Sequence, residues 1–371
     1  MSDAASFRPA AAVPFPAVLV GGVLLVLAAI DPALHALGVV AGHDPWLAWP
    51  LTPDITGSVL LTGWLYIAGQ RQSARLEDGW STTLRQFAFF GGLAALFLAL
   101  QSPIETISDH QFLMHQVEHM LLRTTAPLLL VLAAPQAALL RGLPGWARRW
   151  IIRPLFASRV VRPLGVLGHP AIATMLFVGT TYFWMIPRFH DEAILDEPIH
   201  YLWHTTLLLS GLIFFWRLLD PRPRPLGASL GVRLFMFWVA SIGNILLGSY
   251  LSFKHQVLYS AYAQMGRLWA IAPASDENIG GLIMWIPGSM MFVGTAMLMI
   301  YRWAQQEERS FARQRGAPRP IAAAQFVSQR RSANRKMAVG LVCFMLTVAA
   351  ITFTTVFIYH YAGNAGERAR F

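Results

Sequence analysis

The fold is decided by residues 109–134, which read DHQFLMHQVEHMLLRTTAPLLLVLAA. The purely apolar stretch at its end is too short to cross a bilayer, because a spanning helix needs about 20 mostly apolar residues. About two more turns must come from the preceding part of the sequence. We therefore expect a helix over 112–134 that carries His115 and His119 inside the bilayer, where ionisable side chains are costly and usually functional.

The composition of the whole chain is that of a membrane protein. Of its 371 residues, 55% are hydrophobic and only 13% are charged, whereas a soluble domain carries roughly 25% charged residues. We predict an all-α fold, a polytopic transmembrane helix bundle of about nine spans. The candidate spans lie near 15–36, 56–70, 84–101, 112–134, 168–187, 199–218, 231–251, 281–303 and 337–360. A single cysteine, Cys343, excludes an intrachain disulfide and a cysteine-pair metal motif.

The lysine and arginine residues predict the orientation of these spans. Of the 29, one set of alternating connections carries 23 and the other set carries five, while Arg123 lies within a span. Basic loops stay in the cytoplasm, so we place the N-terminus in the cytoplasm and the C-terminus outside. The poorly basic, outer connections are 38–55, 102–111, 188–199, 252–280 and 361–371. The net charge of +10 then indicates contact with the lipid bilayer, and we expect no nucleic-acid partner.

This topology divides the chain into four parts. Residues 1–55 contain an N-terminal tail, the first transmembrane helix and an outer loop, and residues 56–303 form a seven-helix membrane core. Residues 304–336 form a basic cytoplasmic linker. Residues 337–371 add one C-terminal transmembrane helix and an outer tail.

The histidines indicate where the chemistry lies. Ten of the eleven fall on the outer side, and only His169 is inner. Four of them form the pairs His115/His119 and His200/His204. Residues four apart lie on one helix face with Cβ atoms about 5–6 Å apart, so each pair could give two imidazole nitrogens to one metal ion. If the two helices are neighbours, all four side chains converge on one metal site.

Other side chains at a similar level extend the predicted site. Glu118 is expected either to orient an imidazole or to neutralise Arg123. Imidazole together with methionine thioether favours copper, here Cu(I), over magnesium or calcium. Asp276 or Glu277 could cap the helix that begins there and face the same outer chamber, or could serve as a cap alone. The candidate supporting or additional ligands are Glu118, Asp109, His110, Met114, Asp276 and Met284.

Proline and glycine positions predict local features around these helices. Pro127 lacks an N–H and frees the carbonyl of Arg123, so a kink is expected one turn beneath the first histidine pair. Glu197-Pro198 is typical of a helix start. The paired glycines Gly280 and Gly281 permit close approach of a neighbouring helix.

Three other functions remain open for the same histidines. A membrane oxidoreductase could hold one haem between them, although His169 alone cannot supply a second haem layer. A metal or proton transporter would need a polar route inward, where the spans offer little beyond Arg123, Thr124 and Thr125. Residues 115–119 also match the H-x-x-E-H pattern of inverted zinc peptidases, but without the soluble fold that this chemistry requires.

Several of these segments, taken in order, resemble the CtaG-type, polytopic family of bacterial cytochrome c oxidase assembly factors. The resemblance covers about residues 56–305. The matching residues are His115-Gln116-Val117-Glu118-His119-Met120-Leu121-Leu122, Ala126-Pro127-Leu128-Leu129, Ala134-Pro135, His200, His204, Gly211, Trp216, Gly248, Leu258-Tyr259 and 276–288. The run Asp276-Glu277-Asn278 departs from the family's usual Asp-Gln before the paired glycines.

The resemblance implies a non-enzymatic factor of the bacterial inner (plasma) membrane that helps to build a haem-copper oxidase. The implied step is the delivery of copper to the catalytic subunit of that oxidase. Combined with the histidine pattern, it suggests that copper arrives from the outer side and is held briefly by the two pairs. An outer-side copper chaperone is a further expected partner.

Overall fold

The structure is a computed structural model that describes residues 45–315, apart from 73–78, 158–161, 221 and 223–226. Every regular element in these ranges is a helix, which confirms the all-α prediction. The chain forms two compact units. Unit 1 comprises 1–107 and 121–165, and unit 2 comprises 108–120 and 166–371.

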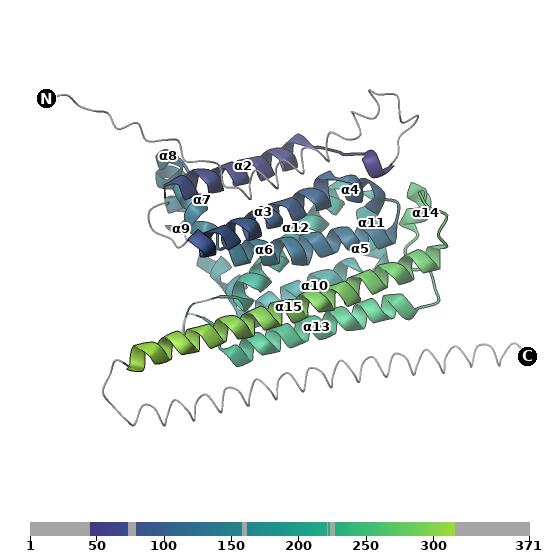
Figure 1. The fold of residues 1–371 in the computed structure, drawn as a ribbon. Coiled ribbons are helices and arrows are strands. Elements are labelled where there is room, and N and C mark those ends of the chain that lie inside the picture. Colours follow the sequence, from purple (N-terminus) through teal and green to yellow (C-terminus); the bar gives the residue numbers. More distant parts are fainter. Residues whose placement is uncertain (1–44, 73–78, 158–161, 221, 223–226, 316–371) are drawn as a thin grey trace, which may run out of the picture. The chain divides into compact units, whose positions relative to one another are not determined.

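The helices follow the predicted core spans closely (Figure 1). The long elements are α2 (Pro53–Arg71), α3 (Gly79–Gln101), α10 (Pro170–Trp184), α12 (Glu197–Leu218), α13 (Leu230–Phe253) and α15 (Pro273–Arg315). The shorter ones are η1 (Pro45–Leu47), α4 (Pro103–Ser108), α5 (Phe112–Met120), η2 (Leu121–Thr125), α6 (Ala126–Ala133), α7 (Gln136–Gly142), α8 (Gly145–Ala147), η3 (Arg148–Ile152), α9 (Arg153–Ala157), η4 (Arg162–Gly168), α11 (Pro187–Leu195) and α14 (Ala261–Met265).

Part of the membrane prediction is supported by these helices. By length and hydropathy, three described helices could cross a membrane, and five could if each of two sharply bent pairs is one span. The first and last predicted spans, 15–36 and 337–360, lie outside the described residues. The count of nine spans, the orientation and the four-part division therefore stay predictions. Residues 304–315 of the predicted linker continue α15.

Unit 1 is held together by close packing of helices around one aromatic cluster. Tyr66 of α2 stacks on Phe89 of α3 with ring centroids 3.8 Å apart. Where α2 meets α7, the contact is between backbones, because a Cβ atom on Gly69 would lie 1.8 Å from the carbonyl oxygen of Ala138. No larger residue fits at that crossing.

A single helical run carries the chain from unit 2 into unit 1. It consists of α5, the π-helical turn η2 and α6. The π turn ends at Thr125, two residues before Pro127. Proline cannot donate to the carbonyl of Arg123, and a wider turn relieves the clash of its ring. The predicted irregularity beneath the histidine pair is thus a π turn. The run ends at Ala134, whose φ of 47° is left-handed, and Pro135 prevents its continuation.

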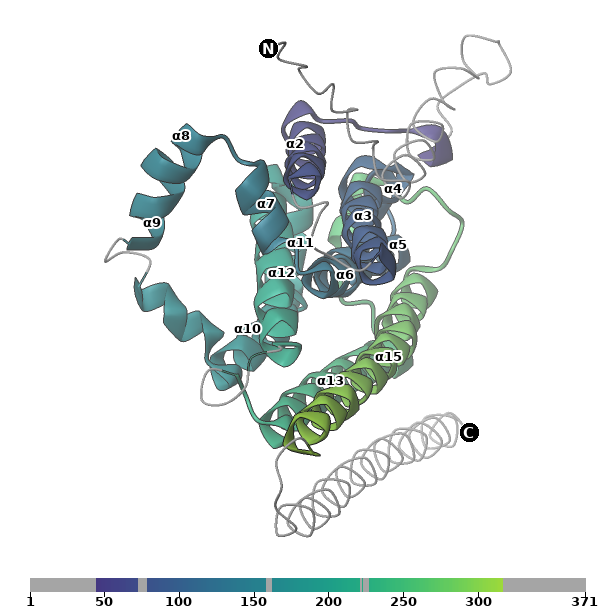
Figure 2. The ribbon, with the colours of Figure 1, turned by 60° about the vertical axis from the view of Figure 1, so that its left-hand side comes forward.

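Unit 2 contains the remaining long helices and the start of that run. Figures 1 and 2 show α13 and α15 side by side along their length. The contact is close because Cβ atoms on Gly248 and Gly281 would lie 2.5 Å from the Cβ atom of Trp285 and 2.6 Å from the backbone nitrogen of Ser252. The expectation that the paired glycines allow a close helix contact is confirmed at this crossing.

One connection differs from the sequence prediction. Residues 188–199 were expected to be an outer loop, but most of them form α11, which bends away from α10 by 76°. Pro187 at the first turn of α11 explains the break, since proline starts a helix well but does not continue one. The bend returns α11 toward α12, and the two helices are in contact.

The α13–α15 contact gives a stability prediction. We expect Gly281→Ala to lower the free energy of unfolding by about 1–3 kcal/mol, because an added methyl group overpacks the crossing. Thermal unfolding of the purified protein in detergent measures this effect. Gly294→Ala on the same helix is the control, since its Cβ position meets no described atom within 4 Å. Equal melting temperatures for both variants would contradict the packing argument.

Candidate metal centre

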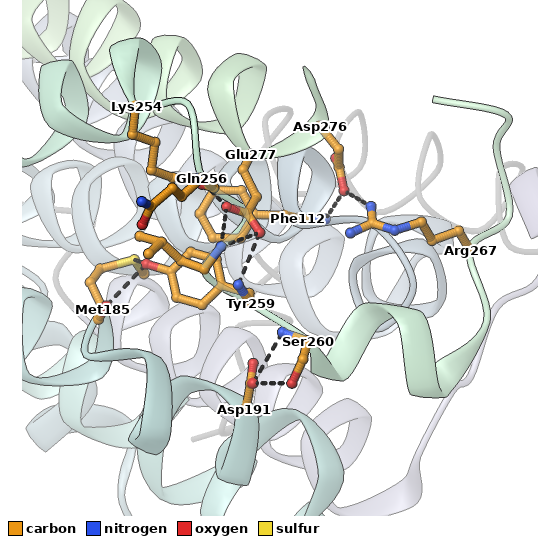
Figure 3. A network of polar contacts seen from close by, with 11 residues as sticks. Phe112, Met185, Asp191, Lys254, Gln256, Tyr259, Ser260, Arg267, Asp276 and Glu277 are labelled. Carbon is orange, nitrogen blue, oxygen red and sulfur yellow. Dashed lines mark hydrogen bonds and ion pairs between the residues drawn. The ribbon is translucent and has the colours of Figure 1, made fainter. Parts of the chain in front are cut away.

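The first histidine pair is positioned by a carboxylate from a distant part of the chain. Asp276 at the start of α15 accepts hydrogen bonds from the backbone N–H groups of Phe112 (3.0 Å) and Leu113 (2.9 Å). It also pairs with Arg267. These contacts cap the N-terminus of α5, whose first N–H groups have no partner within the helix. Figure 3 shows Asp276 between Phe112 and Arg267.

The second pair is positioned by a local cap. The side chain of Asp196 accepts a hydrogen bond from the backbone N–H of Ile199 at 3.2 Å, and Pro198 occupies the first turn of α12. The predicted start of this helix at Glu197-Pro198 is confirmed. His200 and His204 follow on the buried side of the helix.

The two pairs meet inside unit 2. Within each pair the ring centroids are 4.0 Å (His115–His119) and 4.3 Å (His200–His204) apart. Across the pairs, His115 lies 5.3 Å from His200 and 6.2 Å from His204, and His119 lies 5.5 Å from His204. The sequence predicts that the pairs converge if their two helices are neighbours. In the structure the rings do lie together. We call these four residues the histidine cluster.

Three members of the histidine cluster have the spacing of metal ligands. One ligand atom each from His115, His200 and His204 lies within 4.8 Å of the other two. A nitrogen–metal bond is about 2 Å long, so small side-chain rotations would bring all three to one ion. His119 is equally buried and packs at an angle of 81° against His115, where it could serve as a further ligand.

Some polar atoms of the histidine cluster are buried without a hydrogen bond to replace their contact with water. His115 is completely inaccessible, and neither of its ring nitrogens has a hydrogen-bond partner among the described residues. Within the same ranges, Nε2 of His200 also has none. An unpaired buried polar group costs about 1–3 kcal/mol. Such orphaned nitrogens are typical of a site that is completed by a ligand.

Two carboxylates adjoin the cluster. Glu118 is fully buried, and its Oε1 lies 3.0 Å from Nε2 of His204. Glu118 was predicted either to orient an imidazole or to neutralise Arg123, and this distance allows it to orient the ring of His204. Asp109 Oδ1 lies 3.7 Å from Nδ1 of His200, and its side chain remains 33% exposed. Partial burial raises the pKa of Asp109 from 3.8 to about 6, although the nearby His110 and His204 oppose the rise.

The other candidate ligands have different surroundings. His110 has Nδ1 2.6 Å from the carbonyl oxygen of Gly266, and the carboxylate of Asp276 is engaged with α5 and Arg267. Met114 is buried on α5, and Met284 belongs to the apolar cluster around Phe112. Asp276 therefore caps α5, and not the start of its own helix α15, which is the cap that the sequence suggested.

Two buried residues beside the cluster were not predicted. The ring centroid of Trp203 lies 4.7 Å from that of His115, 4.5 Å from His119 and 4.8 Å from His190. His190 of α11 is fully buried, with Nε2 2.9 Å from the hydroxyl of Tyr262. His190 was not predicted at the site because residues 188–199 were assigned to a loop. Trp203 could have been predicted there, because it directly precedes His204 in the sequence.

A strap over residues 254–260 supports this side of the cluster. Fully buried Glu277 pairs with Lys254 and accepts backbone hydrogen bonds from Leu258 and Tyr259, each at 3.0 Å. Asp191 accepts from the backbone N–H and the hydroxyl of Ser260 at 3.0 and 2.7 Å. Figure 3 shows both carboxylates reaching the strap.

The strap delivers an aromatic side chain to the site. The ring of Tyr259 stacks on those of His190 (4.0 Å) and Phe112 (4.8 Å). Its hydroxyl donates to the carbonyl of Met185 at 3.0 Å, and burial raises the pKa of Tyr259 above its ordinary value. Glu277 thus has a structural role in holding this strap.

Removal of the Glu277 charge is expected to destabilise unit 2. Glu277→Gln leaves the buried ammonium group of Lys254 without its counter-charge, which costs about 3–5 kcal/mol. Thermal unfolding followed by circular dichroism measures the loss. The double variant with Lys254→Met removes both charges and should recover most of the stability. A Glu277→Gln protein as stable as the wild type would contradict the assigned role.

Comparisons with known proteins agree with this geometry. The sequence profile of the family described as cytochrome c oxidase caa3 assembly factor matches residues 64–306. An uncharacterized protein of Mycobacterium leprae is 26% identical over 278 residues, which is 72% of this chain and 41% of that protein. Uncharacterized proteins of Mycobacterium bovis and Mycobacterium tuberculosis are each 28% identical over 269 residues, or 70% of this chain and 39% of theirs.

The chain therefore spans about 40% of the length of these curated relatives and no solved structure matches it. The family match covers both histidine pairs, the strap and the residue that caps α5. On this evidence, the chain belongs to the cytochrome c oxidase caa3 assembly factor family.

Proposed function

We propose that this protein holds a copper ion at the histidine cluster and delivers it to the catalytic subunit of the oxidase that it helps to assemble. The observation that carries the proposal is the burial of His115 with two ring nitrogens that lack partners among the described residues. Three imidazoles with ligand atoms within 4.8 Å of one another supply a donor set around it. The family match connects this donor set to oxidase assembly.

The donor chemistry supports copper as the cargo. Imidazole suits copper and zinc, and copper binds nitrogen sites most tightly among the first-row divalent metals. Calcium and magnesium prefer oxygen ligands. Three carboxylates of this region, Asp191, Asp276 and Glu277, are committed to backbone N–H groups. The aromatic surroundings of Trp203 and His190 keep water away, which suits Cu(I). The ion would then be transferred without a catalysed reaction.

The arrangement also favours release. A ligand set of three close imidazoles, with His119 beside them, can hold an ion without the rigid, closed coordination of a structural metal site. Glu118 Oε1 lies 3.0 Å from Nε2 of His204, so it could interact with that imidazole again when the ion leaves. An outer-side copper chaperone would supply the ion, and the oxidase subunit would receive it from within the membrane.

The close ring packing argues against the haem alternative. His115 and His200 are nearly parallel at 14°, with centroids 5.3 Å apart, and Trp203 packs against the first of them at 4.7 Å. Two imidazoles that flank a porphyrin need an open slot for the macrocycle between them. A single ion fits the packed rings better.

Metal analysis of the purified protein tests the site. We expect copper in the wild type and little in a variant with His115, His119, His200 and His204 changed to alanine, because the variant lacks every imidazole of the cluster. His255→Ala removes an exposed histidine as the matched control and should keep the copper. Equal copper in the wild type and the quadruple variant would remove the site, and a Soret band in the wild type would instead support haem.

A second measurement tests the delivery step in cells. Where oxidase assembly depends on this protein, the quadruple variant is expected to yield an oxidase that contains haem but is short of copper. Metal and haem contents of the isolated oxidase give the result, and His255→Ala again serves as the control. A fully copper-loaded oxidase in cells with the quadruple variant would contradict delivery from this cluster.

A further inference from the structure

We infer that Asp109 and His200 form the loading step of the histidine cluster, the point at which an incoming copper ion exchanges water for protein ligands. This inference rests on the proposed function, because it assigns a route to the same cargo. It goes beyond that function by giving one carboxylate a kinetic role, distinct from holding the ion.

Exposure falls in a graded series from Asp109 into the cluster. The side chain of Asp109 is 33% exposed, and that of His200 is 10% exposed. The side chain of His204 is 8% exposed, and Glu118 beside it is fully buried. His115 at the end of the series is inaccessible. Among the cluster and its two carboxylates, Asp109 is therefore the group that water reaches most readily.

The spacing of this series suits the handover of one ion between neighbours. Asp109 Oδ1 lies 3.7 Å from Nδ1 of His200, which is too long for a hydrogen bond but within reach of an ion placed between them. The ring of His200 lies 4.3 Å from that of His204 and 5.3 Å from that of His115. Each step is short enough for a new ligand to bind before the previous one is lost.

An independent observation supports the inner end as the destination of the ion. Nε2 of His200 and both ring nitrogens of His115 are buried without a hydrogen-bond partner in the described part of the chain. The two nitrogens of His200 thus have different surroundings: Nδ1 faces Asp109, and Nε2 is buried with no hydrogen-bond partner among the described residues. A single imidazole links the accessible carboxylate to the buried nitrogens.

The charges around Asp109 fit a cationic cargo. Glu197 lies close enough to interact with it, and the histidines His110, His200 and His204 are its other titratable neighbours. At neutral pH the two carboxylates attract a cation and lower the barrier to its partial dehydration. Such local charge speeds association by about tenfold or more, and salt weakens the effect. A group that contacts the ion only in passing changes both rates and leaves the equilibrium unchanged.

Release kinetics test this role. The full-length protein in detergent is loaded with Cu(I) and mixed with excess bathocuproine disulfonate, whose Cu(I) complex is coloured, so absorbance reports the release rate. Equilibrium competition with the same chelator gives the affinity. We expect Asp109→Asn to slow release about tenfold at low salt, with an affinity within about twofold of the wild type, and to reduce the salt dependence of loading.

The control is Glu192→Gln, which removes the same charge from an exposed position on α11. It should leave both the release rate and the affinity unchanged. An unchanged release rate in Asp109→Asn overturns the loading step, as does faster release with weaker affinity, because that pattern means that Asp109 only supports His200. A wild-type protein that takes up no Cu(I) refutes the proposed function itself, so the two failures are distinguishable.

Discussion

The central constraint in this protein is the burial of His115. An imidazole taken out of water with both ring nitrogens unpaired is destabilising, and both nitrogens lack partners among the described residues. The surrounding structure tolerates this loss by fixing the ring tightly between His119, His200 and Trp203. A side chain held in this way needs only a small rotation to bind an ion, since most of the cost of ordering it has been met on folding.

Five acidic residues of unit 2 near the histidine cluster divide into two groups with different roles. Asp191, Asp276 and Glu277 accept hydrogen bonds from backbone N–H groups of the strap and of α5, so their charge stabilises main-chain geometry. Glu118 and Asp109 instead face imidazole rings. Acidic residues near histidines do not by themselves indicate metal chemistry, and three of these five carboxylates hold the frame around the histidines.

The sequence predicts those features that depend on local spacing. These are the i, i+4 histidine pairs, the helix start at Glu197 and the irregular turn before Pro127. Each of them depends only on residues close together in the sequence. The features that it cannot predict depend on partners far apart. Asp276 caps a helix that begins 164 residues earlier, and His190 reaches the cluster only because α11 bends back at Pro187. Neither relation leaves a periodic signal in the sequence.

A rigid frame and an incompletely satisfied centre suit a protein that passes an ion onward. If every ring nitrogen had a protein partner, an arriving ion would have to break those hydrogen bonds, and the rate of uptake would suffer. If the cluster formed a closed tetrahedral site, release would require that four bonds break together. Three close nitrogens, with His119 and Glu118 beside them, lie between these extremes. The delivery role proposed above requires both uptake and release, and this intermediate arrangement allows both.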